Sequence, residues 1–402
     1  MTLCEEMKLA VQKIQNALKD EEIDGWLFYN FRESNIFASR ILKLPSHLAQ
    51  SRRYFYFIPV SGEPIKIVHN IEQWNLDHLP GEKLIYLTYQ SLQGALAKAL
   101  SNLKVIAMEY SPKNSIPYIS KVDGGTIESI RELGKEIVTS ANLIQFFEAR
   151  WDEEQATDNV ETAKDLRAIV DLTFSFIRNQ ILSNLTLTEY DVQQFMKSEF
   201  TKRGMKTDSD PNCSVNENSA NPHYEPTKEI NSPMKKGDFV LLDLWAKRDK
   251  PRSVYSDITW VGYIGDSVPD EYRRIFRIVA TSRDTAVIAV RNAFSKNEPI
   301  YGFQVDDAAR KVIVDAGYGE YFVHRTGHSI GEEVHGNVAN MDNLETHDER
   351  RIIPQTSFSI EPGIYLPGKF GIRSEINVYI TPNENVVVTG LPIQQEVVPI
   401  LK

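Results

Sequence analysis

Two acidic residues lie inside stretches that otherwise read as buried β-strands. Residues 239–246 form an almost continuous apolar run around Asp243, and residues 255–261 form a β-branched and aromatic run around Asp257. Near-continuous apolar strands are typically covered on both faces. An ionised carboxylate in such a strand is costly unless a metal ion or another cation compensates its charge. Taken alone, each acid is as well explained by the end of a strand or by a pair with an arginine.

The segment between the two acids strengthens this constraint. Residues 247–252 are rich in charge and contain Pro251, which favours a hairpin turn between two antiparallel strands. Such a pairing would bring Asp243 and Asp257 side by side. Two close carboxylates repel each other unless a cation or a proton lies between them. The pattern therefore favours either a metal site or a pair of acids that share one proton.

Three of the eight histidines are clustered at His324, His328 and His335. Gly327 and Gly331 bracket His328, which suggests a bent backbone that presents one imidazole. A neutral imidazole binds metal ions and also carries protons. A solvated loop that happens to contain histidines is the alternative, and the clustering argues against it.

Two further acids stand beside apolar strand residues later in the chain. Glu361 is followed by Pro362 and Gly363, which predict a turn, and Glu375 follows Arg373 by two positions. Residues two apart on a strand share a face, so Arg373 could receive a substrate carboxylate close to Glu375. An ordinary arginine–glutamate pair on the surface of a strand is the alternative.

Four acids in strand contexts and one histidine bracketed by glycines together predict a metal site. One nitrogen and several carboxylate oxygens suit Mn²⁺ or Co²⁺, with Zn²⁺ as a further candidate. Acids that bridge two ions would hold them about 3.5–4 Å apart and let them share a hydroxide nucleophile.

The length of 402 residues favours two domains. Residues 1–150 alternate short apolar strands with helical stretches, which predicts a small α/β domain. Residues 151–402 predict an α+β domain, with helices in pairs and strands in hairpins. Its expected elements include a long helix over residues 152–183, a helix capped by Thr188 and a strand over Tyr321–His324.

Composition argues against several classes of protein. A formal net charge of −10 makes a nucleic-acid-binding surface unexpected. A run of about 18 apolar residues, which a membrane span needs, is missing, and the acidic start of the sequence is unlike a secretory signal. The two cysteines, Cys4 and Cys213, make no disulfide framework, so we expect a cytoplasmic protein.

These segments resemble those of the pita-bread metallopeptidases, a family that includes methionine aminopeptidase, Xaa-Pro aminopeptidase, prolidase and the metal-free relative creatinase. The resemblance is strong over roughly residues 150–402. The first 150 residues resemble, less specifically, the N-terminal domain of the prolidase, Xaa-Pro aminopeptidase and creatinase branch. The implied fold is α+β, with a C-terminal catalytic pita-bread domain over residues 151–402 and an N-terminal α/β creatinase/prolidase-like domain over residues 1–150. The N-terminal domain would serve oligomerisation and form a wall of the pocket.

The five metal ligands of the family match this sequence in order and type. By that resemblance, Asp243 would chelate one ion, and Asp257 and Glu375 would bridge both. His328 and Glu361 would bind the other ion.

The resemblance also implies catalytic roles for five residues. Glu361 would take the proton of the attacking water, and His335 would contact the substrate or the developing charge. His223 matches a histidine on the substrate side, and His324 matches a further active-site histidine of the Xaa-Pro branch. Arg373 matches an arginine near the bridging glutamate.

Five positions depart from the family pattern. Trp245 and Trp260 stand where smaller or polar residues are usual in the family. Ser329 follows His328 where a glycine is usual, and Gly336 follows His335 where an acid is common. Asn377 replaces a frequent aspartate. None of them removes a ligand. They all fall near the pocket, so they bear on the substrate more than on the metal site.

The function that the resemblance implies is that of a metallopeptidase with two divalent ions, Mn²⁺ before Co²⁺ or Zn²⁺. It would use metal-bound hydroxide to cut the bond before proline in dipeptides or short peptides, as a homodimer without nucleic-acid or membrane partners. The sequence leaves open whether it is an Xaa-Pro dipeptidase or an Xaa-Pro aminopeptidase. The alternatives are a hydrolase of another small amide or C–N bond and a non-catalytic pita-bread protein that binds peptides.

Overall fold

The computed structural model describes residues 3–45 and 50–402. The chain forms two compact units, Met1–Glu148 and Ala149–Lys402, called here the first and the second unit. Among the helices in the described ranges, none has the combination of length and apolar character needed to cross a membrane.

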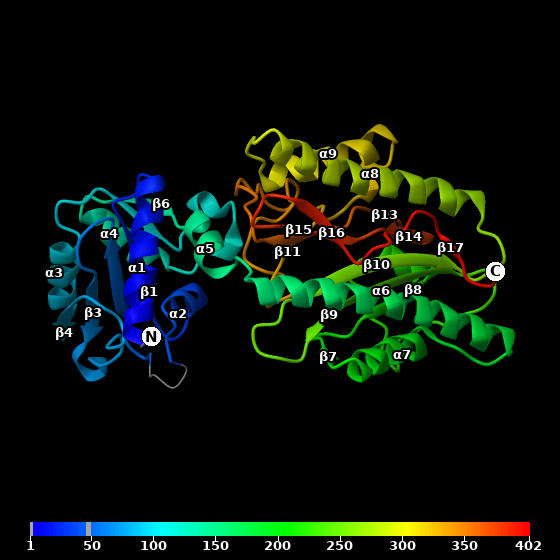
Figure 1. Cartoon of the computed structure of the whole chain (residues 1–402), viewed down its shortest axis with the longest axis horizontal. Coiled ribbons are helices and arrows are strands. Elements are labelled where there is room, and N and C mark those ends of the chain that lie inside the picture. Colours follow the sequence, from blue (N-terminus) through cyan, green and yellow to red (C-terminus); the bar gives the residue numbers. More distant parts are fainter. Residues whose placement is uncertain (1–2, 46–49) are drawn as a thin grey trace. The chain divides into compact units, whose positions relative to one another are not determined.

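The first unit is built on a six-stranded sheet with the strand order β4-β3-β2-β1-β5-β6 (Figure 1). Its strands are β1 (Gly25–Asn30), β2 (Tyr54–Pro59), β3 (Ile65–His69), β4 (Glu82–Tyr86), β5 (Val105–Met108) and β6 (Glu136–Thr139). Its helices are α1 (Leu3–Asp20), α2 (Ile36–Ile41), α3 (Tyr89–Ala99), α4 (Gly124–Glu132) and α5 (Ala141–Glu148). Side chains of β1 alternate between two cores. Trp26 and Phe28 pack with α1, α2 and α5, and Leu27 and Tyr29 pack with α3 and α4.

The second unit contains four long helices and several small sheets. The helices are α6 (Glu153–Leu182), α7 (Glu189–Lys202), α8 (Asp270–Ser295) and α9 (Gly302–Asp315). One sheet has the order β17-β10-β9-β7, with β8 paired to β9; a second has the order β11-β12-β15-β16; and β13 pairs with β14. These strands are β7 (Met205–Lys206), β8 (Asn212–Val215), β9 (Phe239–Arg248), β10 (Ser256–Tyr263), β11 (Ser329–Ile330), β12 (Ser357–Ile360), β13 (Gly363–Leu366), β14 (Phe370–Arg373), β15 (Ile376–Ile380), β16 (Val386–Thr389) and β17 (Val398–Pro399). Figure 1 shows the strands as a middle layer, with α6 and α7 on one side and α8 and α9 on the other.

Capping side chains set the starts of both α6 and α7, and the Thr188 cap of α7 is as predicted. The Asp152 carboxylate accepts from the backbone N–H of Gln155, whose side chain returns a bond to the backbone of Asp152. Thr188 and Asp191 form the same reciprocal arrangement at α7. Each of these reciprocal pairs satisfies backbone N–H groups that the first helical turn leaves without partners. The starts of these two helices are therefore predictable from local sequence.

The strand predicted over Tyr321–His324 is wrong. The structure has a short 3₁₀ turn, η5 (Gly319–Tyr321), followed by irregular chain. Two backbone carbonyls of this segment accept from one guanidinium, because Arg310 donates to Phe322 O at 2.9 Å and to His324 O at 2.8 Å. A side chain from α9 thus replaces the ladder bonds that a strand would need.

The β9–β10 hairpin gives the second unit its two-faced central sheet. Val240, Leu242 and Leu244 of β9 pack into the core that contains α6 and α7. Successive strand residues point to opposite faces, so Asp243 and Trp245 lie on the other face. In the antiparallel register Thr259 is opposite Asp243, and Asp257 is opposite Trp245. The two acids are therefore diagonal neighbours on one face, not side by side as expected.

Candidate metal centre

His328 is held in one orientation by the strand beside it. A Cβ atom on Gly327 would lie 2.0 Å from Ser359 O, so only glycine allows this approach. The Ser359 hydroxyl accepts from the backbone N–H of His328 at 2.9 Å. On the ring, Nδ1 lies 3.0 Å from Ser329 O. A carbonyl can only accept, so Nδ1 carries a proton, and Nε2 is the ring nitrogen that faces the site.

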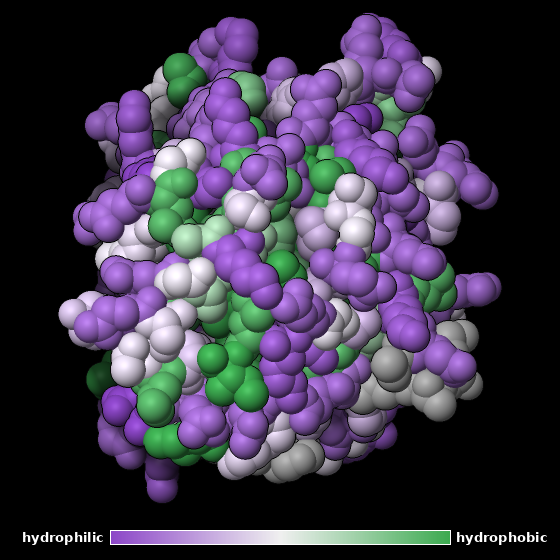
Figure 2. Space-filling view, turned by 90° about the vertical axis from the view of Figure 1, so that its left-hand side faces the viewer, coloured by the Kyte–Doolittle hydropathy of each residue, from purple (hydrophilic) through white to green (hydrophobic). Residues whose placement is uncertain are grey.

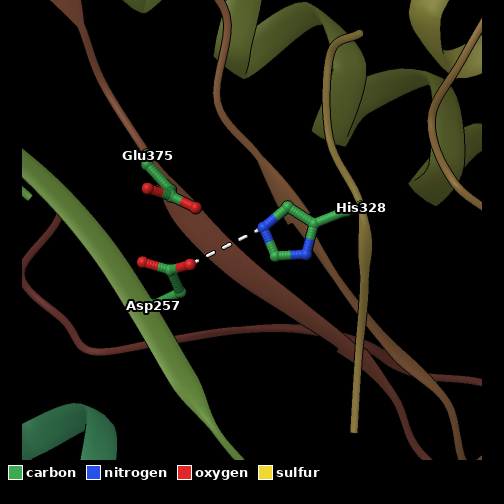
Figure 3. Close-up of side chains that lie close together, drawn as sticks. All are labelled: Asp257, His328 and Glu375. Atoms are coloured by element: carbon green, nitrogen blue, oxygen red, sulfur yellow. Dashed lines mark ion pairs between the residues drawn. The ribbon is translucent and has the colours of Figure 1, made fainter. Parts of the chain in front are cut away.

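Nε2 of His328 faces a group of buried carboxylates. Ligand atoms of Asp257, His328 and Glu375 all lie within 4.8 Å of one another, and Figure 3 shows the three side chains converging. His328 Nε2 lies 3.6 Å from Asp257 Oδ2 and 3.5 Å from Glu361 Oε1. Four of the five predicted ligands thus gather around one point.

Asp243, the fifth predicted ligand, is joined to this group through Thr259 and Arg373. The hydroxyl of Thr259 lies 2.8 Å from Asp243 Oδ1 and 2.8 Å from Glu375 Oε2. Arg373 Nε donates to the same hydroxyl at 2.8 Å. The Thr259 hydroxyl has a single proton, so it donates to only one of the two carboxylates at a time. Arg373 also forms an ion pair with Asp243.

Arg373 is therefore engaged with the acids rather than free for a substrate. Its Nε lies 3.9 Å from Glu361 Oε2, and its Nη1 lies 3.5 Å from the Tyr365 hydroxyl. The side chain is only 6% exposed. These contacts favour the alternative that Arg373 braces the acid cluster over the prediction that it receives a substrate carboxylate.

The backbone around Glu361 and Glu375 differs from the expected one. Arg373 ends β14, whereas Glu375 lies between β14 and β15. The two residues converge because the chain changes sheets there: β14 pairs with β13, and β15 pairs with β12. The turn predicted at Pro362 and Gly363 is also absent, since Glu361 and Pro362 link β12 to β13 without a turn and Gly363 already belongs to β13.

The pKa values and the unpartnered oxygens of the carboxylate cluster indicate a site for cations. Burial and the neighbouring charge of Asp243 raise the pKa of Asp257 to about 7. Burial, followed by the nearby carboxylates, raises the pKa of Glu375 well above its usual range. Among the residues that the structure describes, Asp257 Oδ1 and Glu375 Oε1 are buried without a hydrogen-bond partner. If all four carboxylates were ionised, Arg373 alone would not compensate their charge, and the oxygen-rich donor set fits divalent ions.

The three histidines predicted to serve the substrate occupy different settings. His335 is exposed, and its ring meets the His328 ring edge-on with centroids 4.3 Å apart. His324 is half-buried, with Nε2 2.8 Å from the Tyr365 hydroxyl and Nδ1 2.7 Å from Arg325 O. His223 is exposed, and its charge contributes to a lowered pKa of His335, behind the larger effects of His328 and burial.

A buried acid outside the predicted set organises the loop that carries His223. Glu189 accepts from the backbone N–H groups of Val215 and Ser232, each at 2.7 Å, and from the Tyr224 hydroxyl at 2.6 Å. Because these donors lie before and after His223, one carboxylate fixes both ends of the loop. Sequence reasoning identified Glu189 only as part of a helical stretch.

Sequence reasoning also missed two of the groups that arrange the ligands. Thr259 follows Asp257 by two positions in a strand, and that spacing alone could have placed it on the same face. Asn377 was noted as a departure, and it accepts from the backbone N–H of Asp257 at 2.8 Å while donating to the Asp257 carbonyl at 2.7 Å. No local sequence signal links residues so far apart.

Comparison with known proteins now places this chain. The model of metallopeptidase family M24 matches residues 161–382. The chain belongs to metallopeptidase family M24. It is 32% identical over 204 residues to an Xaa-Pro dipeptidase of Lactobacillus delbrueckii subsp. lactis, which is 50% of this chain and 49% of that protein. It is 38% identical over 171 residues to a probable dipeptidase PepE of Mycobacterium bovis, which is 42% of this chain and 41% of that protein. The chain thus spans about half the length of the curated relatives it matches.

Solved structures resemble both units. Dipeptidase PepE from Mycobacterium ulcerans matches with a TM-score of 0.69 and 22% identity, over 98% of each chain. A prolidase from Thermococcus sibiricus matches with a TM-score of 0.62 and 21% identity, also over 98% of each chain. The predicted fold class, α+β with a pita-bread domain of the prolidase branch, is confirmed.

Proposed function

We propose that this chain is a two-metal Xaa-Pro peptidase that hydrolyses the bond before proline in dipeptides or short peptides. The observation that carries the proposal is the convergence of Asp257, His328 and Glu375, with buried carboxylate oxygens that lack partners. Curated relatives named Xaa-Pro dipeptidase and putative Xaa-Pro aminopeptidase support the substrate class. The domain that would carry the activity is residues 151–402.

Five residues would hold the ions. Asp243 would bind one ion, His328 and Glu361 would bind the other, and Asp257 and Glu375 would bridge them. A pair of divalent ions would polarise the scissile carbonyl and acidify the attacking water. We propose Mn²⁺ as the native metal, with Co²⁺ and Zn²⁺ as alternatives, since one imidazole among carboxylates suits these ions. A solved Caenorhabditis elegans relative is described as having a di-nuclear active site.

Glu361 is the group best suited to accept the proton of the attacking water. Burial disfavours its charged form, but positive charge on His328 and Arg373 outweighs burial and lowers its pKa. Glu361 is therefore ionised at neutral pH and able to act as a base. It is also less buried than Glu375, so water reaches it more easily.

His335 is suited to stabilise charge on the substrate as a hydrogen-bond donor. Positive charge on His328 lowers the pKa of His335 to about 3, so the ring is neutral at neutral pH. Cations bound in the cluster would act in the same direction. His223 and His324 would complete the substrate side of the pocket, and Arg373 would hold Asp243 and Thr259 in place.

Activity assays test the proposal directly. Xaa-Pro dipeptides and longer Xaa-Pro peptides are compared with Mn²⁺, Co²⁺ and Zn²⁺, with a chelator as control. We expect metal-dependent cleavage before proline, and preference for dipeptides or for longer peptides separates a dipeptidase from an aminopeptidase. Cleavage of other amide or C–N bonds but not of Xaa-Pro bonds would favour the alternative hydrolase. Tight peptide binding without turnover would favour a non-catalytic protein.

We also propose that the chain forms homodimers through the first unit. Strand β4 is one of the two edge strands of its sheet. Ile85 in β4 is 48% exposed, and Leu87 and Tyr89, which follow β4, are each 65% exposed. Figure 2 looks onto this side of the first unit, where hydrophobic side chains gather among hydrophilic ones. Apolar surface at an open sheet edge is typical of an interface. Light scattering on Leu87→Glu should give monomers, with Leu182→Glu, an exposed position on α6, as the control.

A cytoplasmic location is proposed on the cysteine chemistry. Cys213 is buried and free, and thiols stay reduced in that compartment. Fractionation of cells that express the chain would test this, and recovery outside the cytoplasm would contradict it.

A further inference from the structure

A large aromatic side chain lies beside the candidate metal centre and has no part in it. Trp245 is directly opposite Asp257 in the β9–β10 ladder. Residues directly opposite each other in an antiparallel pair share a face, with Cβ atoms about 4.5–5.5 Å apart. The Cβ atom of Trp245 is therefore a close neighbour of the Cβ atom of Asp257, whose carboxylate faces the site. It is half-buried, so part of the ring remains accessible.

The indole is fixed in its orientation. Its Nε1 donates to the Ser209 hydroxyl at 3.2 Å. The ring packs against an apolar cluster that contains Tyr255 and Ile330, together with Val334. Ile330 follows His328 by two positions, and Val334 precedes His335, so the cluster also supports the segment that carries these two histidines. A ring held at its polar edge and its apolar face forms a rigid wall.

The opposite face of the hairpin provides a contrast. The expectation that Trp260 lies near the pocket is wrong, because Trp260 is one of the buried residues of the core beneath α6 and α7. The guanidinium of Arg167 lies 3.7 Å from its ring centroid. Trp260 is only 7% exposed and points away from Asp257, because residues three apart in a strand face opposite sides. One hairpin thus carries a core tryptophan and a site tryptophan.

We propose that Trp245 is a specificity-determining residue that selects an apolar side chain on the substrate residue before the scissile bond. The inference rests on the proposed Xaa-Pro peptidase function. In that reaction the attacked carbonyl belongs to Xaa, so the side chain of Xaa is the one nearest to a carboxylate that bridges the ions. An apolar side chain gains by packing on the indole, whereas a charged one would lose water there without gaining a partner. The substrates are thus peptides with leucine, methionine or another apolar residue before proline.

Specificity constants for a dipeptide panel test this selection. Leu-Pro, Gly-Pro, Lys-Pro and Asp-Pro are compared for the wild type, Trp245→Gly, Trp245→Phe and Trp260→Phe, at matched metal content. The wild type should prefer Leu-Pro. In Trp245→Gly the ratio of kcat/KM for Leu-Pro over Gly-Pro should fall by about 10- to 100-fold. Trp245→Phe should keep most of the ratio, and Trp260→Phe should keep the wild-type ratio even if it lowers stability.

Binding of the free amino acid L-leucine, measured by calorimetry, gives a second readout. Leucine is a product of the panel reaction, and its affinity should drop in Trp245→Gly but not in Trp260→Phe. An unchanged ratio and unchanged leucine affinity in folded Trp245→Gly would overturn the inference while leaving the peptidase function intact. A wild type that cleaves no Xaa-Pro dipeptide would instead refute the proposed function. In that case, leucine binding that is lost in Trp245→Gly would still support an apolar wall at Trp245. Leucine binding that does not depend on Trp245 would overturn the inference about Trp245 as well.

Discussion

Buried carboxyl groups at one site in each unit, Glu109 in the first and the candidate metal centre in the second, have different surroundings. In the first unit, Glu109 accepts from Trp26 Nε1 at 2.6 Å, from Asn35 Nδ2 at 2.7 Å and from the Ser140 hydroxyl at 3.3 Å. All three partners are neutral, and both carboxyl oxygens are satisfied. In the second unit, Asp257 and Glu375 have neighbours that are mostly other acids.

The difference shows what marks a functional acid in this chain. Burial raises the pKa of Glu109 to about 7, and burial raises that of Asp257 to about 7 as well. The shift alone therefore does not separate the two regions. Asp257 differs in having a partnerless oxygen and like charges around it, with Asp243 and Glu361 both raising its pKa. Unsatisfied oxygens among acids indicate a site suited to a cation, whereas satisfied oxygens indicate a structural role.

The largest expected effect follows from removing one of the proposed bridging acids. Asp257→Ala or Glu375→Ala should lower both metal content and hydrolysis, since each residue would contribute to two ions. Losing several kcal/mol of charge stabilisation corresponds to about 10³-fold or more in rate. The same variants should make the metal-free protein melt at a higher temperature, because they remove repulsion. Elemental analysis, Xaa-Pro assays and calorimetry check this, and normal metal content with full activity would refute the bridging role.

Glu109→Ala should show the opposite signature. It would leave the donors of Trp26, Asn35 and Ser140 without their acceptor, at a cost of roughly 2–4 kcal/mol of unfolding free energy. Metal content and the activity of the folded fraction should stay normal. Denaturant unfolding, monitored alongside metal content, measures both. A loss of bound metal in folded Glu109→Ala would erase the distinction between the two regions.

The predictability of the two regions also differs, for a physical reason. Asp243 and Asp257 could be recognised from sequence because a charge inside an apolar strand violates local patterning. Glu109 also directly follows an apolar run, Val105–Met108. What local patterning misses at Glu109 is its set of partners, which lie far away in the chain at residues 26, 35 and 140. Local rules detect a conflict within one element but not a compensation that forms between distant elements.

The same limit explains the errors near the candidate metal centre. Arg373 and Glu375 were placed on one strand because they are two residues apart, and both do face the cluster. The change of pairing partner between β14 and β15 depends on β12 and β13, which the local pattern does not reveal. The fold class, the capped helices and the convergence of the predicted ligands followed from patterning and resemblance, whereas the bracing roles of Thr259 and Arg373 required coordinates.

Arg373 provides a smaller test of the comparison, because it is the cation that the acid cluster already has. Arg373→Ala should raise the repulsion around Asp243 and lower metal affinity or activity by about 10- to 100-fold, as is typical for a residue that orients ligands. Since Arg373 is engaged with Asp243 and Thr259, the loss should be equal for dipeptides and longer peptides. Arg373→Lys should recover part of it. A loss confined to substrates with a nearby free carboxylate would instead assign Arg373 to substrate binding.

The smallest expected effect is a pH dependence of stability that Glu109 confers. Its ordinary pKa is 4.5, and the fold raises this to about 7. Between these values the folded chain keeps a proton that the unfolded chain has released, so the stabilisation is full below about pH 4.5 and is lost as the pH rises through about 7. The slope is at most about 1.4 kcal/mol per pH unit. Glu109→Gln cannot titrate, so the wild type minus this variant isolates the effect in urea unfolding from about pH 5 to pH 7.5. A difference that does not change with pH would mean that three neutral donors suffice to hold Glu109 as an anion. Glu109 would then differ from Asp257 and Glu375 only because its carboxylate oxygens have hydrogen-bond partners, and not because it is protonated.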